Sequence, residues 1–331
     1  MISNQFLTSA SLPLVSIVIP TFERLNYLPY AIESALAQTY QNIEVIVSDD
    51  ASTVDVQSLV ATFPDPRIRY RRNQSNMGQA LNNLAALKET KGKYVANLHD
   101  DDMWEPTFLE KLIPALERHK DAVLAFSDHF IMDSDGKIDD HLTEQGEVKY
   151  KRHTLAPGIH RPFCRIGLVD LSIPLAMACV YKKAAIDWDD FPAEVNSFYD
   201  RWLIYLACRT GMGAYYHAER LTRYRVHPVS ATSTSGVDFP RSSLACHVRF
   251  LQDERLRPLW PDLRRMRDLS YIRLGICQLE VGDVDGARHN LRLSIKSKPS
   301  VRAIAALCLS VLPLHMIHKV VNKYRGHADA K

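Results

Sequence analysis

Alternation between short β-branched runs and helix-like stretches limits the fold of this chain more than any other feature of its sequence. The strand-like runs occupy residues 15–20, 43–48, 68–71, 94–98 and 122–127. Helical spacing of apolar residues fills the intervals, at 27–38, 54–61, 79–89 and 107–119. Strands joined by helices of this length need crossover connections, which make the strands parallel and place helices on both faces. The pattern therefore predicts an α/β fold with a mostly parallel, Rossmann-like sheet flanked by helices.

The remainder of the chain breaks this alternation and then turns helical. Residues 133–136 predict the turn of a hairpin, and 140–160 predict a polar loop. Strands are expected at 176–181 and 214–216, on either side of a helix at 197–208. Residues 271–297 predict a helix pair joined at Gly282 and Asp283, and so a helical C-terminal extension. We expect three parts: residues 1–127, 128–240 and 241–331.

The charge is distributed unevenly along the chain, and the cysteines are dispersed. Residues 1–150 hold 13 Lys and Arg against 22 Asp and Glu, whereas residues 151–331 hold 28 against 16. The acidic half argues against a nucleic-acid groove, and the basic half suits an anionic partner. The 6 cysteines include no C-x-x-C pair, which predicts neither a disulfide framework nor structural zinc, and favours a reducing compartment.

The two ends of the chain bear on localisation. The first twenty residues lack the basic region of a signal peptide, so none is expected. The longest apolar run, residues 303–317, is too short to span a bilayer. Basic residues flank it on both sides: Lys296, Lys298, Arg302, Lys319, Lys323 and Arg325. This pattern predicts peripheral contact with a membrane surface, and the alternative is that the run packs against the 271–297 helix pair.

Acidic residues follow three of the predicted strands, at 20–23, 49–52 and 99–102, where ligands bind in parallel sheets. His99-Asp100-Asp101-Asp102 brings three carboxylates together, and their repulsion would be relieved by a divalent cation with hard oxygen ligands. The alternative is a solvated acidic turn that caps the following helix. Asp49 and Asp50 could likewise cap a helix or accept hydrogen bonds from a ligand.

Four segments carry a resemblance to glycosyltransferase family 2. They are residues 15–23 (VSIVIPTFE), 46–52 (IVSDDAS), 76–78 (NMG) and 99–106 (HDDDMWEP). The resemblance implies a GT-A fold and an inverting, metal-dependent transfer from a nucleotide-sugar donor, a UDP-sugar, to an acceptor hydroxyl. It makes residues 1–127 the donor-binding part and 128–240 the acceptor-binding part with the catalytic base. Many members have aspartate where His99 stands.

The resemblance also assigns roles to individual residues. Donor contacts fall on Pro20, Thr21, Glu23, Asp49, Asp50, Asn76, Gly78, Asn82 and Asp100, with Asp50 binding the base most directly. Asp101 and Asp102 would hold Mn²⁺ or Mg²⁺, joined by His227. Residues 221–228 resemble a segment that closes the site in this family. Arg223 and Arg225 alternate along it and would face the donor phosphates, unless this run is an ordinary exposed edge strand.

An inverting transfer also needs a carboxylate that takes the proton from the acceptor hydroxyl. Asp200 matches the family's base in sequence order and falls in the first turn of the predicted 197–208 helix. It could instead cap this helix, or pair with Arg201 or Arg209. Other carboxylates that could serve as the base are Asp187, Asp189, Asp190 and Glu194.

Competing functions remain open at the level of sequence. They are a nucleotidyltransferase of nucleotide sugars and a non-catalytic nucleotide-sugar-binding relative. No G-x-G-x-x-G follows the first strand, and no P-loop motif occurs, which argues against dinucleotide and nucleoside-triphosphatase chemistry. The resemblance implies polysaccharide or glycan biosynthesis, a saccharide or lipid-linked saccharide acceptor and no nucleic acid. The dispersed cysteines and the lack of a signal-peptide pattern predict a cytoplasmic location, at the inner face of the cell membrane if the 303–317 run makes contact there.

Overall fold

The computed structural model describes residues 12–228, 230 and 236–317. Contacts divide the chain into two units. The sheet unit comprises residues 1–193 and 199–230, and the helical unit comprises residues 194–198 and 231–331. The predicted parts 1–127 and 128–240 both contribute strands to the single sheet of the first unit, so their division into donor and acceptor parts stays a prediction.

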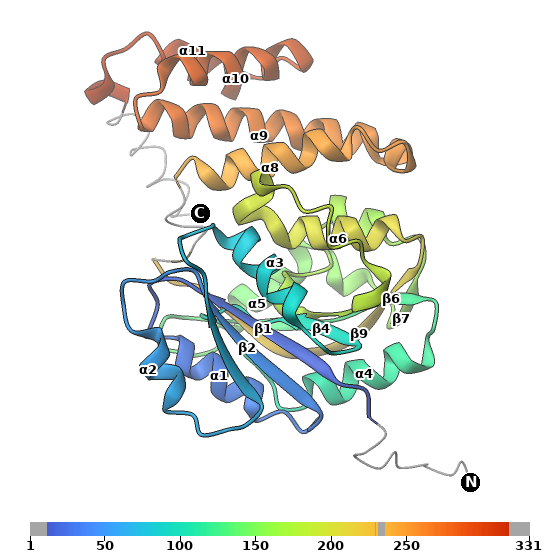
Figure 1. Cartoon of the computed structure of the whole chain (residues 1–331). Helices are drawn as coiled ribbons and strands as arrows, with labels where there is room; N and C mark the ends of the chain where they lie inside the picture. The colour runs from blue at the N-terminus through green and yellow to red at the C-terminus, as the bar shows by residue number, and fades with distance from the viewer. Residues whose placement is uncertain (1–11, 229, 231–235, 318–331) are drawn as a thin grey trace. The chain divides into compact units, whose positions relative to one another are not determined.

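The described strands form one nine-stranded sheet in the order β3-β2-β1-β4-β8-β6-β9-β5, with β7 paired to β9 (Figure 1). Their bounds are β1 Val15–Thr21, β2 Ile43–Asp49, β3 Ile68–Arg72, β4 Tyr94–Asn97, β5 Met103–Trp104, β6 Ala122–Met132, β7 Gly158–His160, β8 Cys179–Lys182 and β9 Gly213–Arg225. Strands β1 to β4 pair in parallel, as do β6 and β9. Strand β8 runs antiparallel between β4 and β6, and β5 and β7 run antiparallel to β9. The mostly parallel sheet is confirmed.

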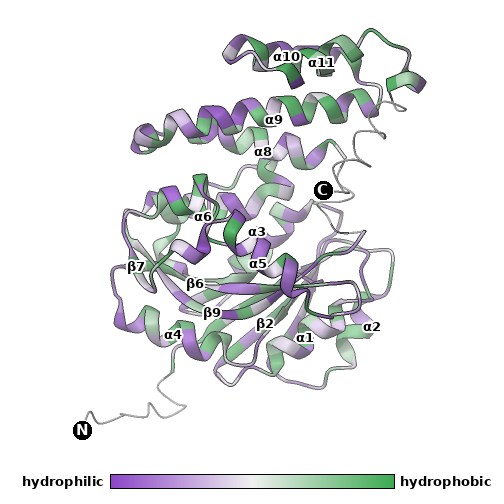
Figure 2. Ribbon diagram, turned by 180° about the vertical axis from the view of Figure 1, so that it is seen from behind, coloured by the Kyte–Doolittle hydropathy of each residue, from purple (hydrophilic) through white to green (hydrophobic). Residues whose placement is uncertain are grey.

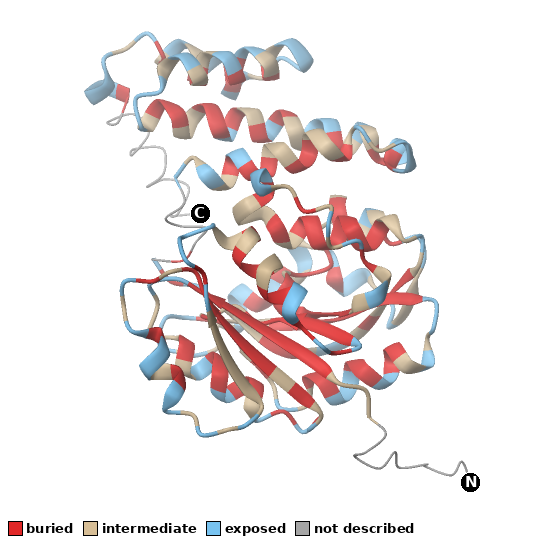
Figure 3. Ribbon diagram, viewed as in Figure 1, coloured by how far each residue is buried: buried red, intermediate tan, exposed pale blue. Residues whose placement is uncertain are grey.

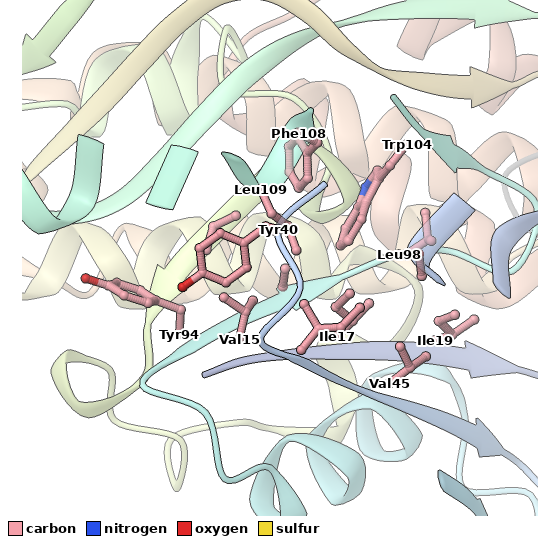
Figure 4. Packing of buried hydrophobic residues seen from close by; sticks show 14 of the residues in the cluster. Val15, Ile17, Ile19, Tyr40, Val45, Tyr94, Leu98, Trp104, Phe108 and Leu109 are labelled. Atoms are coloured by element: carbon pink, nitrogen blue, oxygen red, sulfur yellow. The ribbon is translucent and has the colours of Figure 1, made fainter. Parts of the chain in front are cut away.

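Helices lie on both faces of this sheet. In the sheet unit they are α1 Leu28–Leu36, α2 Val56–Ala61, α3 Gln79–Glu89, α4 Phe108–Arg118, α5 Asp140–Lys149 and α6 Tyr199–Arg209. Helices α1, α2 and α4 lie on one side of the sheet, and α3 and α6 lie on the other (Figures 1 and 2). Alternate residues of β1 (Val15, Ile17 and Ile19) pack with Trp104 and Phe108 in the main core (Figure 4). The central strands β1, β2, β4 and β8 are almost entirely buried, as expected for a sheet covered on both faces, whereas the edge strand β3 is only half-buried (Figure 3).

The predicted elements of the first half agree with the structure to within two residues at nearly every boundary. The second half needs a correction, because residues 140–149 form helix α5 rather than a polar loop. Asp139 begins this helix by accepting a hydrogen bond from the backbone N–H of Leu142 (2.9 Å). The predicted strand at 214–216 is also longer than expected, since β9 extends over 13 residues.

Four α-helices lie in the described part of the helical unit: α8 Asp238–Phe250, α9 Trp260–Glu280, α10 Val284–Ser297 and α11 Val301–Leu309. The predicted helix pair corresponds to α9 and α10, and the side chain of Asp283 begins α10 by accepting from the backbone N–H of Gly286. Helix α11 packs on this pair through Ala303 and Ala306. No helix in the described ranges is long and apolar enough to cross a membrane.

We expect Gly92→Ala to destabilise the sheet unit without touching the acidic residues. A Cβ at this position would lie 2.6 Å from the hydroxyl of Ser16 and 2.7 Å from the backbone nitrogen of Ser16. Relieving such a clash with backbone costs about 1–3 kcal/mol. Thermal unfolding should show a clear loss for Gly92→Ala and almost none for the neighbouring exposed substitution Lys91→Ala. Equal stability of the two variants would contradict the close approach.

Candidate active site

The acidic motif occupies the turn between β4 and β5, and each of its carboxylates has different partners. Asp100 accepts hydrogen bonds from the Thr21 hydroxyl (2.7 Å) and from Arg24 (2.8 Å). Asp101 also pairs with Arg24. Asp102 is fully buried, and one oxygen accepts from the backbone N–H of Arg225 at 2.8 Å. The turn is therefore tied both to the end of β1 and to the end of β9.

Burial and mutual repulsion make this cluster electrostatically costly. Burial, reinforced by the neighbouring Asp101, raises the pKa of Asp100 and of Asp102 to about 6. Burial also opposes ionisation of Asp101, but its hydrogen bond with His227 and the charge of Arg24 hold its pKa below the ordinary value. The cluster thus carries negative charge that additional positive charge would stabilise.

The ligand atoms of this cluster suit a hard divalent cation. Ligand atoms of His99, Asp101 and Asp102 all lie within 4.8 Å of one another. His227 reaches the same place, with Nε2 at 3.1 Å from a carboxylate oxygen of Asp101. Carboxylate oxygens are the ligands that Mg²⁺ prefers, and Mn²⁺ is served by carboxylate and water as well. The residues present therefore fit the predicted metal.

Asp200 lies beside this cluster, in the first turn of α6. One carboxylate oxygen accepts from the backbone N–H of Ala176 (2.9 Å) and lies 3.4 Å from Nε2 of His99. Burial alone would raise the pKa of Asp200, but the charge of His99 and these hydrogen bonds lower it, so the carboxylate is ionised at neutral pH. Arg201 instead donates to the backbone carbonyl of Ile173, and Arg209 contacts Asp190.

His99 lies between the acidic cluster and Asp200. Its Nδ1 lies 2.9 Å from the second oxygen of Asp102, and its Nε2 faces Asp200. Burial would lower the pKa of this imidazole, but Tyr199, Asp200 and Asp102 together raise it well above the ordinary value. The sequence drew attention to His99 only as a departure from the family pattern, and its position between two carboxylates is visible only in the fold.

The second acidic pair is engaged within the protein. Asp50 accepts from Asn73 (2.7 Å) and from the backbone N–H groups of Met77 and Gly78 (2.9 Å each). Gly78 adopts φ 82°, a left-handed conformation that suits glycine, where α3 begins. Asp49 is fully buried and accepts from Ser52 and Tyr70, and it pairs with Arg72. Both carboxylates therefore shape the loops of this edge, and their contact with a donor stays a prediction.

The other predicted donor-binding residues lie at the same edge of the sheet. Pro20 and Thr21 end β1. Glu23, exposed and at φ 54°, accepts from the backbone N–H and the hydroxyl of Thr53, which ties the β1–α1 loop to the loop after β2. Asn76 accepts from the backbone N–H of Gly78, and Asn82 is buried against Ser48 of β2.

The structure places the basic residues of the 221–228 segment differently from one another. Arg225 donates to the backbone carbonyl of Asp101 (2.8 Å), and its guanidinium lies 4.6 Å from the ring centroid of Tyr27. Arg223 pairs with Glu105 at 2.6 Å. The two arginines therefore have different partners: Arg225 supports the acidic turn, whereas Arg223 pairs with Glu105. Sequence reasoning also missed Arg24, whose only signal was its place directly after Glu23 in the loop that follows β1.

Comparison with known proteins assigns the family. Residues 16–168 match the profile described as "Glycosyl transferase family 2". An uncharacterized glycosyltransferase of Rickettsia typhi is 30% identical over 229 residues, which cover 67% of each chain. The chain is a family 2 glycosyltransferase.

One further relative and two solved structures resemble this chain. The Escherichia coli protein WfaP, named UDP-Glc:alpha-D-GlcNAc-diphosphoundecaprenol beta-1,3-glucosyltransferase, is 29% identical over 230 residues, covering 70% of this glycosyltransferase and 84% of WfaP. Residues 1–349 of S. aureus TarS, solved in complex with UDP-GlcNAc, share the fold with a TM-score of 0.60 at 15% identity, covering 92% of this chain and 87% of that one. The mannosyltransferase PcManGT from Pyrobaculum calidifontis, solved with GDP-Man and Mn²⁺, gives a TM-score of 0.56 at 16% identity, covering 92% and 81%. These likenesses support the GT-A-like fold.

We expect His99→Asn to slow sugar transfer by this glycosyltransferase more than it weakens donor binding. Asparagine keeps a hydrogen-bonding group near the position of Nδ1, facing Asp102, but it cannot reach Asp200. Loss of a residue that orients a catalytic site typically costs about 10–100-fold. Initial transfer rates and donor-dependent thermal shifts should be compared with those of His141→Asn, an exposed histidine of α5. A His99→Asn enzyme with the wild-type rate would argue against the connection.

Proposed function

We propose that this glycosyltransferase moves a sugar, with inversion, from a UDP-sugar to an acceptor hydroxyl, and that Asp200 is the general base. The observation that carries the proposal is the arrangement around His99, which lies 2.9 Å from Asp102 and 3.4 Å from Asp200. This arrangement supports assigning the cation to the acidic cluster and the role of base to Asp200, at one edge of the sheet. Inverting transfer needs both groups on opposite sides of the reacting sugar carbon.

The protein side chains have separate tasks in this mechanism. Asp200, held by the backbone of Ala176 and by His99, would take the proton from the acceptor hydroxyl as its oxygen bonds to the sugar carbon. The bond from that carbon to the diphosphate breaks, and the nucleoside diphosphate leaves with the bonding electrons. Asp101 and Asp102, assisted by His227, would hold Mn²⁺ or Mg²⁺. When bound, such a cation supplies Lewis-acid stabilisation of the diphosphate charge.

The choice of donor and acceptor class draws on the relatives. WfaP is named for a UDP-glucose donor and a diphosphoundecaprenol-linked acceptor, and TarS was solved with UDP-GlcNAc. These names support a uridine donor and a saccharide or lipid-linked saccharide acceptor for this chain. We further propose a role in polysaccharide or glycan biosynthesis, carried out on the cytoplasmic side of the membrane.

A panel of nucleotides tests the donor assignment. A ligand that binds only the folded protein raises its apparent stability by about 2.7 kcal/mol at 100 times its Kd. UDP and UDP-sugars should raise the unfolding temperature in the presence of Mn²⁺, and GDP-sugars should raise it less. Donor turnover should release UDP. Release of pyrophosphate from UTP and a sugar 1-phosphate would instead indicate a nucleotidyltransferase, and binding without any turnover would indicate a non-catalytic relative.

A further inference from the structure

Helix α11 has two apolar faces, and the described structure buries one of them. Ala303 and Ala306 are buried in the cluster that α11 forms with α9 and α10, and Ile317 joins this cluster after the helix ends. The other face carries Val301 and Ile304, which are 85% and 46% exposed. Residues three apart share a side of a helix, so Ala303 and Ala306 lie on one side and Val301 and Ile304 lie on the other, away from the cluster.

Exposed apolar side chains continue beyond the helix. The chain turns after Leu309, and Val311, Leu314 and Met316 are 73%, 44% and 43% exposed. Figure 2 shows hydrophobic residues recurring along α11, and Figure 3 shows exposed positions there. Exposed apolar residues gathered in one segment are characteristic of a contact surface, whereas scattered single ones need no explanation.

The charges around this segment are of one sign. Residues 286–317 contain five Lys and Arg and no Asp or Glu. Lys296 lies in the last turn of α10, Lys298 lies between α10 and α11, and Arg302 lies in the first turn of α11, and all three are exposed. Apolar side chains bordered by cations complement an anionic bilayer, whose headgroups attract the cations while the apolar groups enter the interface. A nucleic acid would match the cations but would leave the apolar side chains in water.

We propose that this surface, formed by Lys296, Lys298, Arg302 and the exposed apolar residues of 301–316, docks the protein on an anionic membrane surface. The apolar side chains enter the headgroup region, and the segment does not cross the bilayer. All of these residues belong to the helical unit. The docking proposal therefore does not depend on the proposed transfer reaction, and its test does not use activity.

Flotation of the full-length protein with vesicles tests the proposal. The protein should float with phosphatidylcholine vesicles that contain phosphatidylglycerol, and not with phosphatidylcholine alone, and added salt should reduce the recovery. The double variant Ile304→Asp, Val311→Asp should reduce the floated fraction at least about tenfold. Val148→Asp, at a position 61% exposed on α5 in the sheet unit, is the matched control and should float like the wild type.

Charge reversal tests the basic residues of this surface. Lys296→Glu with Lys298→Glu should lower binding to the anionic vesicles, whereas Lys120→Glu, also exposed but in the sheet unit, should not. Unfolding temperatures of all variants should match that of the wild type, because the substituted side chains are exposed. Equal flotation of the wild type and the Ile304→Asp, Val311→Asp variant would overturn the proposal. So would a dimer in solution that this variant converts to a monomer, because a second copy would then be the occupant.

Discussion

Replacing Asp200 by asparagine is expected to lower the transfer rate by about 10²–10⁴-fold, the usual contribution of general base catalysis. Asparagine keeps the side-chain oxygen that accepts from the backbone of Ala176, so the loop before β8 and the start of α6 should hold their places. The amide cannot take a proton. Donor binding, measured as the thermal shift with a UDP-sugar and Mn²⁺, should stay close to that of the wild type.

The neighbouring carboxylates supply the controls for this result. Asp189 pairs with Lys88 and its side chain is 89% exposed, and Asp190 contacts Arg209. Asp187 accepts from the backbone N–H of Asp189, and Glu194 lies 3.6 Å from Arg249 in the helical unit. Asp189→Asn should therefore retain transfer. An Asp200→Asn enzyme of near wild-type rate, together with an inactive Asp189→Asn enzyme, would transfer the role of base to Asp189.

Asp101→Ala should abolish the dependence of donor binding on Mn²⁺ while the protein stays folded. Among the three carboxylates of the motif, Asp101 is the one whose pKa lies below its ordinary value, so its charged form, which is the form that binds a cation, is favoured. Lewis-acid stabilisation of charge is worth several kcal/mol, and about 2.8 kcal/mol corresponds to a hundredfold in affinity. We expect donor affinity in the presence of Mn²⁺ to fall at least about a hundredfold, which isothermal titration measures directly.

Chelation of divalent cations should reproduce the effect of Asp101→Ala in the wild-type protein. Removal of divalent cations with EDTA should weaken UDP-sugar binding to the level of Asp101→Ala, and EDTA should then have no further effect on that variant. Asp135→Ala, in the exposed turn after β6, should behave like the wild type. If Asp101→Ala kept a wild-type response to Mn²⁺, the cation would have to bind elsewhere.

The first half of the fold and the position of the acidic edge could be predicted because they depend on local pattern. The runs that became β1, β2 and β4 are strongly apolar, and the rule that ligands lie at the carboxyl ends of parallel strands placed Asp49 and Asp101 on the same edge. Helix α3 was predicted at 79–89 with its observed bounds because its apolar spacing is clear and Gly78 precedes it.

The remaining features depend on contacts between distant segments. Strand β8 is a short run whose place between β4 and β6 is set by pairing on both of its sides, and β9 gains its length from pairing with β6. The amphipathic spacing of α5 is weak, so the polar sequence around it resembles a loop. No local pattern shows that both oxygens of Asp50 are engaged by the 73–78 turn, or that His99 faces Asp200. Side-chain direction at a strand end is decided by the surrounding fold.

The connection between β9 and the acidic turn also has a consequence for the order in which the protein can be completed during synthesis. Asp102 and the backbone N–H of Arg225 that binds it are separated by 123 positions, and Asp101 is separated from His227 by 126. At about 5–20 residues per second, a ribosome needs roughly 6–25 s to cover such a distance. During that interval β1 to β4 can already pair, whereas the turn that follows β4 lacks the partners that fix it. Contacts of such long sequence separation form late because loop closure must precede them. The acidic turn is therefore among the last parts of the sheet unit to mature on a growing chain.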